Sequence, residues 1–263
     1  MTSQPRPGLT VHGTRIGAGT PPVAIVPLVA ASVEQLLDAA RTALDAGAEL
    51  LEWRIDHLET GMPDGPERTA TVVETAQHLR GIAGDVPLLA TVRTAAEGGE
   101  RPIPDKDYGE LLTALAQLGP QRGADLLDVE ICRDTDLVAE VIAAAHAAGV
   151  AVVGSHHRFD ATPGEAEMVA MLQRIAAAGP DLAKLAVMPR DEADVLALLR
   201  ATHQAAAEVE VPVLTMSMGP LGAISRLAGT VTGSVGTFAV VGEPSAPGQL
   251  PLDLVVRWRD LTA

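Results

Sequence analysis

The sequence is poor in several residue types, and each shortage excludes a class of protein. Cysteine occurs once, at Cys132, which excludes an internal disulfide and a metal site built from paired cysteines. We expect Cys132 to be a semi-buried, inert thiol. The start of the chain lacks the basic and apolar stretches of a signal peptide, and no apolar run is long enough to span a bilayer. We therefore expect a cytoplasmic protein without a membrane partner.

Positive charge is also scarce. The formal net charge is −15, and lysine occurs only at Lys106 and Lys184. A broadly acidic surface argues against nucleic acid as a partner. If the substrate is an anion, the basic residues must be concentrated at its binding site.

What the chain does have is a repeated pattern of apolar runs and helical stretches. Its 263 residues are rich in Ala, Leu and Val, as expected for helices packed on parallel strands. We expect a (β/α)8 barrel, an α/β fold, because eight runs of strand length alternate with stretches of helical periodicity. The runs are Val23–Val29, Glu49–Ile55, Pro87–Val92, Asp125–Ile131, Val150–Ser155, Leu182–Val187, Val211–Met216 and Gly233–Val240.

The ends of the chain complete this prediction. Residues 1–8 are polar and proline-rich, which indicates a disordered tail, and residues 9–20 have the pattern of a short β-hairpin. Residues 9–263 would then form a single barrel domain, with a last helix over Pro251–Leu261. An open doubly wound sheet is the alternative, but no GxGxxG motif follows the first strand, and neither a P-loop nor an HExxH motif is present.

In a barrel of this kind the chemistry lies at the carboxyl ends of the strands. Glu52 and Arg54 are two residues apart and therefore point to the same side of a strand, as a structural ion pair or as part of a site. Lys184 lies in an apolar strand of a protein that rarely uses lysine. Desolvation would disfavour its ammonium form and free the amine as a nucleophile, whereas the alternative is a buried lysine paired with a carboxylate such as Glu130.

Two adjacent histidines end another strand. His157 is the candidate for proton transfer, and only one of His156 and His157 can point into the barrel because neighbouring strand residues face opposite ways. Adjacent side chains cannot easily share one ion and no third ligand is evident, so we expect no metal. The Gly-, Pro- and Ser-rich segment 242–249 is either a surface turn or a lid over a ligand.

Several of these segments resemble type I 3-dehydroquinate dehydratases. The resemblance spans roughly residues 9–250 and rests on seven motifs in the family's order, which are ELLEWRID, TVRTAAEGGE, SHHRFDATP, KLAVMP, LTMSMG, GAISRLAG and SAPGQ. Two positions depart from the pattern. His156 stands where family members commonly have Asn, and Pro27 stands where some have Ser.

The resemblance implies a dehydration of 3-dehydroquinate to 3-dehydroshikimate by a homodimer that needs no cofactor. Lys184 would form an imine with the C3 ketone, His157 would remove the C2 proton and protonate the departing C1 hydroxyl, and Glu97 would orient His157. Arg226 would bind the substrate carboxylate. The remaining residues that it implies for substrate binding are Glu52, Arg54, Arg93, Ser245, Gln249, Phe159, Met216 and Phe238.

Two other functions stay open. A class I aldolase would also use an imine-forming lysine on this strand, but it would not require the SAPGQ segment or an arginine for a ring carboxylate. A module that binds such ligands without turnover would not require a nucleophile beside a base.

Overall fold

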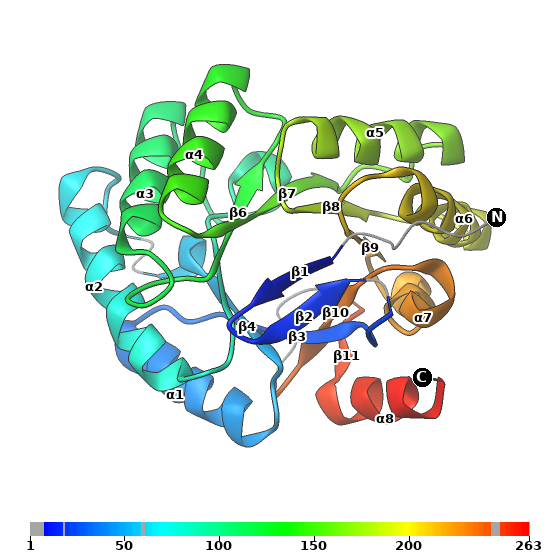
Figure 1. Ribbon diagram of the computed structural model, residues 1–263, viewed down its shortest axis with the longest axis horizontal. Coiled ribbons are helices and arrows are strands. Elements are labelled where there is room, and N and C mark those ends of the chain that lie inside the picture. Colours follow the sequence, from blue (N-terminus) through cyan, green and yellow to red (C-terminus); the bar gives the residue numbers. More distant parts are fainter. Residues whose placement is uncertain (1–7, 18, 59–60, 243–247, 263) are drawn as a thin grey trace.

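Eight parallel strands form the ring at the centre of the molecule (Figure 1). The computed structural model describes residues 8–17, 19–58, 61–242 and 248–262. The ring consists of β3 (Val23–Leu28), β4 (Leu50–Arg54), β5 (Leu88–Thr91), β6 (Leu126–Glu130), β7 (Ala151–Arg158), β8 (Leu182–Val187), β9 (Val213–Ser217) and β10 (Gly236–Val240). A parallel bridge between Val213 and Ser234 and a hydrogen bond from the Val235 amide to the Val213 carbonyl join β9 to the segment that leads into β10. The predicted barrel is confirmed.

Helices follow the strands and cover the outside of the ring (Figure 1). They are α1 (Val33–Asp45), α2 (Pro66–Ala83), α3 (Asp105–Leu118), α4 (Thr135–Ala147), α5 (Glu165–Ala177), α6 (Glu192–Glu208), α7 (Gly229–Thr232) and α8 (Leu252–Thr262). Three begin after a side chain that accepts a hydrogen bond from the first turn, namely Ser32, Asp134 and Asp191. None of the helices in the described segments is both long and apolar enough to cross a membrane.

Shorter elements connect strands to helices at the carboxyl end of the ring. The 3-10 helices are η1 (Ile55–His57), η2 (Ala95–Glu97) and η3 (Leu221–Arg226), and the two-residue strand β11 (Leu250–Pro251) pairs with β10. Glu97 and Arg226 lie on these connections, and Arg54 and Gln249 adjoin them.

The strands are apolar on both faces, as a buried parallel sheet requires. Outward-facing side chains such as Leu51, Leu127 and Leu185 pack under the helices. Inward-facing side chains near the amino ends of the strands form a separate apolar cluster that includes Ile25, Leu50, Leu89, Leu126, Val153, Leu182 and Leu214. We call this cluster the floor of the barrel.

An N-terminal hairpin closes the floor from below. Strands β1 (Gly8–Val11) and β2 (Thr14–Gly17) pair antiparallel, and Val11 and Ile16 join the apolar cluster. His12 at the turn contacts Asp125, whose carboxylate lies 2.9 Å from its Nδ1 just before β6 begins. The predicted hairpin is confirmed, although Gly8, which the sequence placed in the tail, already pairs with Gly17; residues 1–7 lie outside the described part.

Candidate active site

A pocket opens inside the ring above the floor, toward the carboxyl ends of the strands. Its lining includes eleven of the twelve residues that the resemblance implies: Glu52, Arg54, Arg93, Glu97, His157, Phe159, Lys184, Met216, Arg226, Phe238 and Gln249. Gly98, Ala186 and Met218 line it as well and were not predicted. Ser245 lies outside the described residues, as does most of the predicted lid. The fold thus brings the described members of the predicted site together in one pocket.

Lys184 extends from β8 into the pocket and is 3% exposed. Its Nζ donates to Asp128 Oδ2 at 3.0 Å and lies 3.8 Å from Glu52 Oε1. The Phe238 ring covers it at 4.8 Å from the ring centroid. The sequence allowed a buried lysine paired with a carboxylate such as Glu130. The structure shows such a pair, but the partner is Asp128, two residues before Glu130 in β6.

A network of buried charges connects the end of β5 to β6 at the wall of the pocket. Arg93 donates from Nη2 to Asp128 Oδ1 at 2.7 Å, and from Nη1 to Glu130 Oε1 at 3.0 Å and to Ser155 Oγ at 3.1 Å. Burial alone would raise the pKa of Asp128, but the charges of Arg93 and Lys184 outweigh it and hold that pKa well below its usual range. Asp128 is therefore an anion that fixes both cations.

The pair formed by Glu52 and Arg54 differs from the ion pair that their spacing suggested. Both line the pocket from β4, but Arg54 binds Asp56 with two hydrogen bonds of 2.8 and 2.7 Å. Glu52 instead accepts a hydrogen bond from Thr91 at 2.9 Å and faces Lys184. The two residues share a side of the strand, as predicted, and have different partners.

Glu97 holds the His157 ring in place at the rim of the pocket. Its Oε2 lies 2.8 Å from His157 Nδ1 and accepts the His157 backbone amide at 3.0 Å. Burial and the neighbouring Arg93 lower the pKa of His157 to about 3, so the imidazole is neutral at neutral pH. With Nδ1 donating to the carboxylate, the lone pair lies on Nε2, which makes His157 a proton acceptor.

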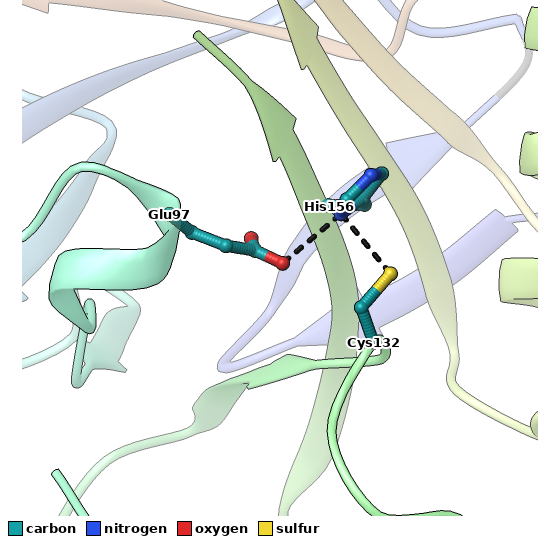
Figure 2. Close-up of side chains that lie close together, drawn as sticks. All are labelled: Glu97, Cys132 and His156. Carbon is teal, nitrogen blue, oxygen red and sulfur yellow. Dashed lines mark hydrogen bonds and ion pairs between the residues drawn. The ribbon is translucent and has the colours of Figure 1, made fainter. Parts of the chain in front are cut away.

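His156 contacts the same carboxylate from the other side of β7 and does not line the pocket. Its Nδ1 lies 3.0 Å from Glu97 Oε1 and 3.2 Å from Cys132 Sγ (Figure 2). The hydrogen bonds to Cys132 and Glu97 raise the pKa of His156 to about 9. Alternation along the strand explains why only one ring enters the pocket, but it did not predict that both would bind Glu97.

A tight turn after β5 places Glu97 within reach of both rings. Gly98 adopts a left-handed conformation with φ of 84° at the end of η2, and a Cβ there would collide with the Phe159 ring. A Cβ at Gly99 would collide with the Arg93 carbonyl. Phe159 itself is 45% exposed at the mouth of the pocket. Only glycine permits a turn this close to the strand and to Phe159.

Arg226 enters from η3 on the opposite side of the pocket. It donates from Nη1 to the Phe238 carbonyl at 3.4 Å, and burial lowers the pKa of its guanidinium to about 10. That value still leaves a cation at neutral pH, so a bound carboxylate would be attracted to it. Gln249 lines the pocket just after the segment that lies outside the described residues, and a Cβ at Gly248 would meet the Gly219 carbonyl.

Cys132 differs from its prediction. It is exposed rather than semi-buried because it follows the last residue of β6 in a turn and points toward His156 (Figure 2).

The ring of parallel strands and the charged pocket at its carboxyl end place the chain among the (β/α)8-barrel enzymes. The chain belongs to the type I 3-dehydroquinase family, whose pattern matches residues 24–259.

Similar proteins agree over nearly the whole chain. The 3-dehydroquinate dehydratase of Geobacillus thermodenitrificans is 43% identical over 249 residues, which are 94% of this chain and 93% of that protein. That of Lactiplantibacillus plantarum is 41% identical over 248 residues, 94% of this chain and 95% of that protein. The structure of type I 3-dehydroquinate dehydratase from Clostridium difficile, solved with covalently modified comenic acid, has a TM-score of 0.90 and 35% identity and covers 97% of this chain and 98% of its own.

Proposed function

We propose that this chain dehydrates 3-dehydroquinate to 3-dehydroshikimate through an imine on Lys184. The observation that carries the proposal is the pairing of a buried amine with a neutral, carboxylate-oriented imidazole in one pocket. The family and its relatives, which are 3-dehydroquinate dehydratases, supply the substrate. The relative from Clostridium difficile with a covalently modified ligand supports covalent chemistry in such a pocket.

The reaction begins with substrate binding. Arg226 would bind the C1 carboxylate, and the polar side chains of Glu52, Arg54 and Gln249 would contact the ring hydroxyls. The resemblance implies that Arg93 helps to hold the ring hydroxyls and the charge balance. Three carboxylates surround its guanidinium, which supports the charge balance as its main role.

Imine formation activates the substrate. The Lys184 amine, having given up a proton, attacks the C3 carbonyl carbon, and the carbonyl oxygen leaves as water. The resulting iminium withdraws electrons from C2, so a base as weak as imidazole can remove the C2 proton. Asp128, an anion held next to Nζ, would stabilise the positive iminium without taking part in bond changes.

His157 would then carry the proton. Its Nε2 takes the proton from C2, and the electron pair forms the C1–C2 double bond as the C1 hydroxyl departs. His157 returns the proton to that hydroxyl, so a second water leaves from the same face. Glu97 stabilises the imidazolium that exists between these steps. Hydrolysis of the product imine regenerates Lys184, and no external oxidant or cofactor is required.

The deciding experiment is to add 3-dehydroquinate to the purified protein and follow the ultraviolet absorbance of the conjugated enone. We expect absorbance to rise with turnover. A class I aldolase would cleave a carbon–carbon bond without producing this product, and a binding module would bind the ligand without any change in absorbance. Either of these results would overturn the proposed function.

We also propose that the protein acts in the cytoplasm as a homodimer, which the family resemblance implies. Exposed apolar side chains on α6, η3, α7 and α8 support self-association, since such groups are costly to leave in water. They include Leu196, Ile224, Val231 and Trp258. Light scattering coupled to size-exclusion chromatography should give twice the chain mass, and a mass of one chain at micromolar concentration would contradict the dimer.

A further inference from the structure

Three side chains that ligate metals in other proteins converge just outside the pocket. They are Glu97 at the end of η2, Cys132 in the turn after β6, and His156 on β7 (Figure 2). Glu97 Oε1 and Cys132 Sγ lie 3.0 and 3.2 Å from His156 Nδ1, and the three atoms all lie within 4.8 Å of one another. Each comes from a different strand end, so the barrel itself brings them together.

One ring nitrogen contacts both other groups. His156 Nδ1 lies within hydrogen-bond distance of a carboxylate oxygen, which accepts only, and of a cysteine sulfur. With a proton on Nδ1, the ring shares one N–H between oxygen and sulfur. A cation in place of that proton would meet three donor atoms, namely the ring nitrogen, the carboxylate oxygen and the sulfur.

The spacing suits a small tetrahedral ion. Zinc binds sulfur at about 2.3 Å and nitrogen or oxygen at about 2.0–2.2 Å, which places neighbouring ligand atoms roughly 3.3–3.6 Å apart. The observed distances of 3.0 and 3.2 Å would need to open by a few tenths of an ångström. Glu97 is buried and anchored through its other oxygen, whereas Cys132 is exposed, so an ion can enter from solvent and keep a water as its fourth ligand.

The donor set also selects the kind of ion. Thiolate and imidazole favour zinc and similar thiophilic cations, while magnesium and calcium prefer oxygen ligands alone. The two histidines are adjacent on one strand and could not easily bind one ion together. The structure separates them, because His157 faces the pocket and His156 finds its partners on two other loops.

We propose that Glu97, Cys132 and His156 form a binding site for one thiophilic divalent cation of the zinc class, and that the bound ion inhibits the enzyme. Inhibition rests on the proposed function. The ion would bind Glu97 through Oε1 and withdraw charge from the carboxylate whose Oε2 orients His157. Glu97 would then stabilise the His157 imidazolium less well. Because the ion lies outside the substrate pocket, kcat should fall while KM changes little.

Binding is tested first, by a readout that does not depend on turnover. Cobalt(II) is titrated into the full-length protein, and sulfur-to-metal charge-transfer absorption is recorded. We expect one cobalt ion per chain. His156→Asn should weaken binding at least about tenfold, since losing a ligand costs no less than losing a group that merely supports one. His146→Asn is the matched control, because His146 also contacts a carboxylate, Asp181 at 2.9 Å, but has no thiol beside it.

Activity is tested second, with zinc. The wild type should lose turnover with unchanged KM, and Cys132→Ser should keep its basal turnover while requiring at least about tenfold more zinc for the same inhibition. Cys132→Ala repeats the test without a hydroxyl. No charge-transfer absorption, equal cobalt affinity in wild type and His156→Asn, or equal zinc sensitivity in wild type and both Cys132 variants would overturn the proposal. If 3-dehydroquinate is not turned over at all, the proposed function fails, and the cobalt titration still decides whether the site exists.

Discussion

The two ends of the barrel interior differ in character, although the same strands form both: one end is apolar and the other is charged. Toward the amino ends the inward side chains are leucine, isoleucine and valine, and the hairpin seals them from water. Two residues further along each strand, the inward side chains include Glu52, Asp128 and Lys184, all buried. Buried charges are costly unless they are paired. Ion pairs and hydrogen bonds therefore stabilise the carboxyl end of the barrel interior, which we call the upper end, whereas apolar packing stabilises the floor. Changes at the upper end should therefore damage chemistry, and changes in the floor should damage stability.

The largest effect is expected at Lys184. Lys184→Ala should lower turnover by several orders of magnitude and abolish the adduct that borohydride traps with substrate, because no amine remains to form the imine. Lys184→Arg should not rescue turnover, since a guanidinium stays protonated. Intact mass and peptide mapping should place the wild-type adduct on Lys184. Lys106, 81% exposed in its side chain, is the control, and an adduct on Lys106 or normal turnover in Lys184→Ala would refute the mechanism.

Replacing His157 should reduce turnover far more than replacing His156. His157→Ala should reduce kcat by roughly 10²–10⁴-fold, the usual contribution of a general acid–base group, while borohydride still traps the imine. His156→Ala should retain most of its turnover because its ring lies outside the pocket. Steady-state kinetics of both variants give the comparison. The reverse order of activities would show that the base has been misassigned.

The floor provides the opposite test on the same strand. Leu182→Ala, two residues before Lys184, should lower the free energy of unfolding by about 2–5 kcal/mol because it leaves a cavity in a packed core. Urea denaturation measures this change, and kcat at low temperature should stay close to that of the wild type. Val29→Ala, at a side chain that is 38% exposed and lies outside the proposed self-association surface, is the control and should change stability little. Equal destabilisation in the two variants would argue against the floor as a distinct core.

A smaller effect is expected at the edge of the pocket. Gln249→Ala should raise KM for 3-dehydroquinate by about two- to tenfold, equivalent to one hydrogen bond of roughly 0.5–1.5 kcal/mol. Its melting temperature should match that of the wild type. A large loss of stability with unchanged KM would show that Gln249 supports the fold instead.

Acid should lower the free energy of unfolding through the charged groups of the upper end rather than through the apolar floor. Burial would raise the pKa of Asp56, but its two hydrogen bonds and ion pair with Arg54 outweigh burial and lower the pKa below the ordinary value of an aspartate. This stabilisation is present above the ordinary aspartate pKa and is lost as the pH falls through the lower, folded-state pKa. Asp56→Asn should reduce the acid dependence of unfolding measured by denaturant titration, and an unchanged dependence would contradict it. Leu182→Ala should leave that dependence intact.

The sequence predicted the strands well because their physical signal is local. Apolar runs covered on both faces have to be buried, and all eight predicted runs contain or overlap a strand of the ring. Alternation along a strand requires that only one of His156 and His157 points into the barrel, and the family resemblance selects His157. Most of the candidate site therefore followed from reading the ends of the strands and from the family resemblance.

What the sequence did not predict are the partners between strands. Lys184 on β8 pairs with Asp128 on β6 rather than with Glu130. Which carboxylate meets which cation depends on the stagger between neighbouring strands, and this is a property of the closed ring rather than of any segment. The approach of Cys132 to His156 has the same origin, since the turn after β6 sets it.

The hairpin that closes the floor has a consequence for the order in which the molecule is built. Its residues are synthesised before those of the ring, yet Val11 and Ile16 pack in the same cluster as Leu214 and Val235, about two hundred residues later in the chain. The hairpin can dock fully only after almost the entire ring has been synthesised. Contacts this distant in sequence slow folding and leave apolar surface exposed meanwhile. The hairpin, although it is made before the ring, thus reaches its final place only after the ring has formed.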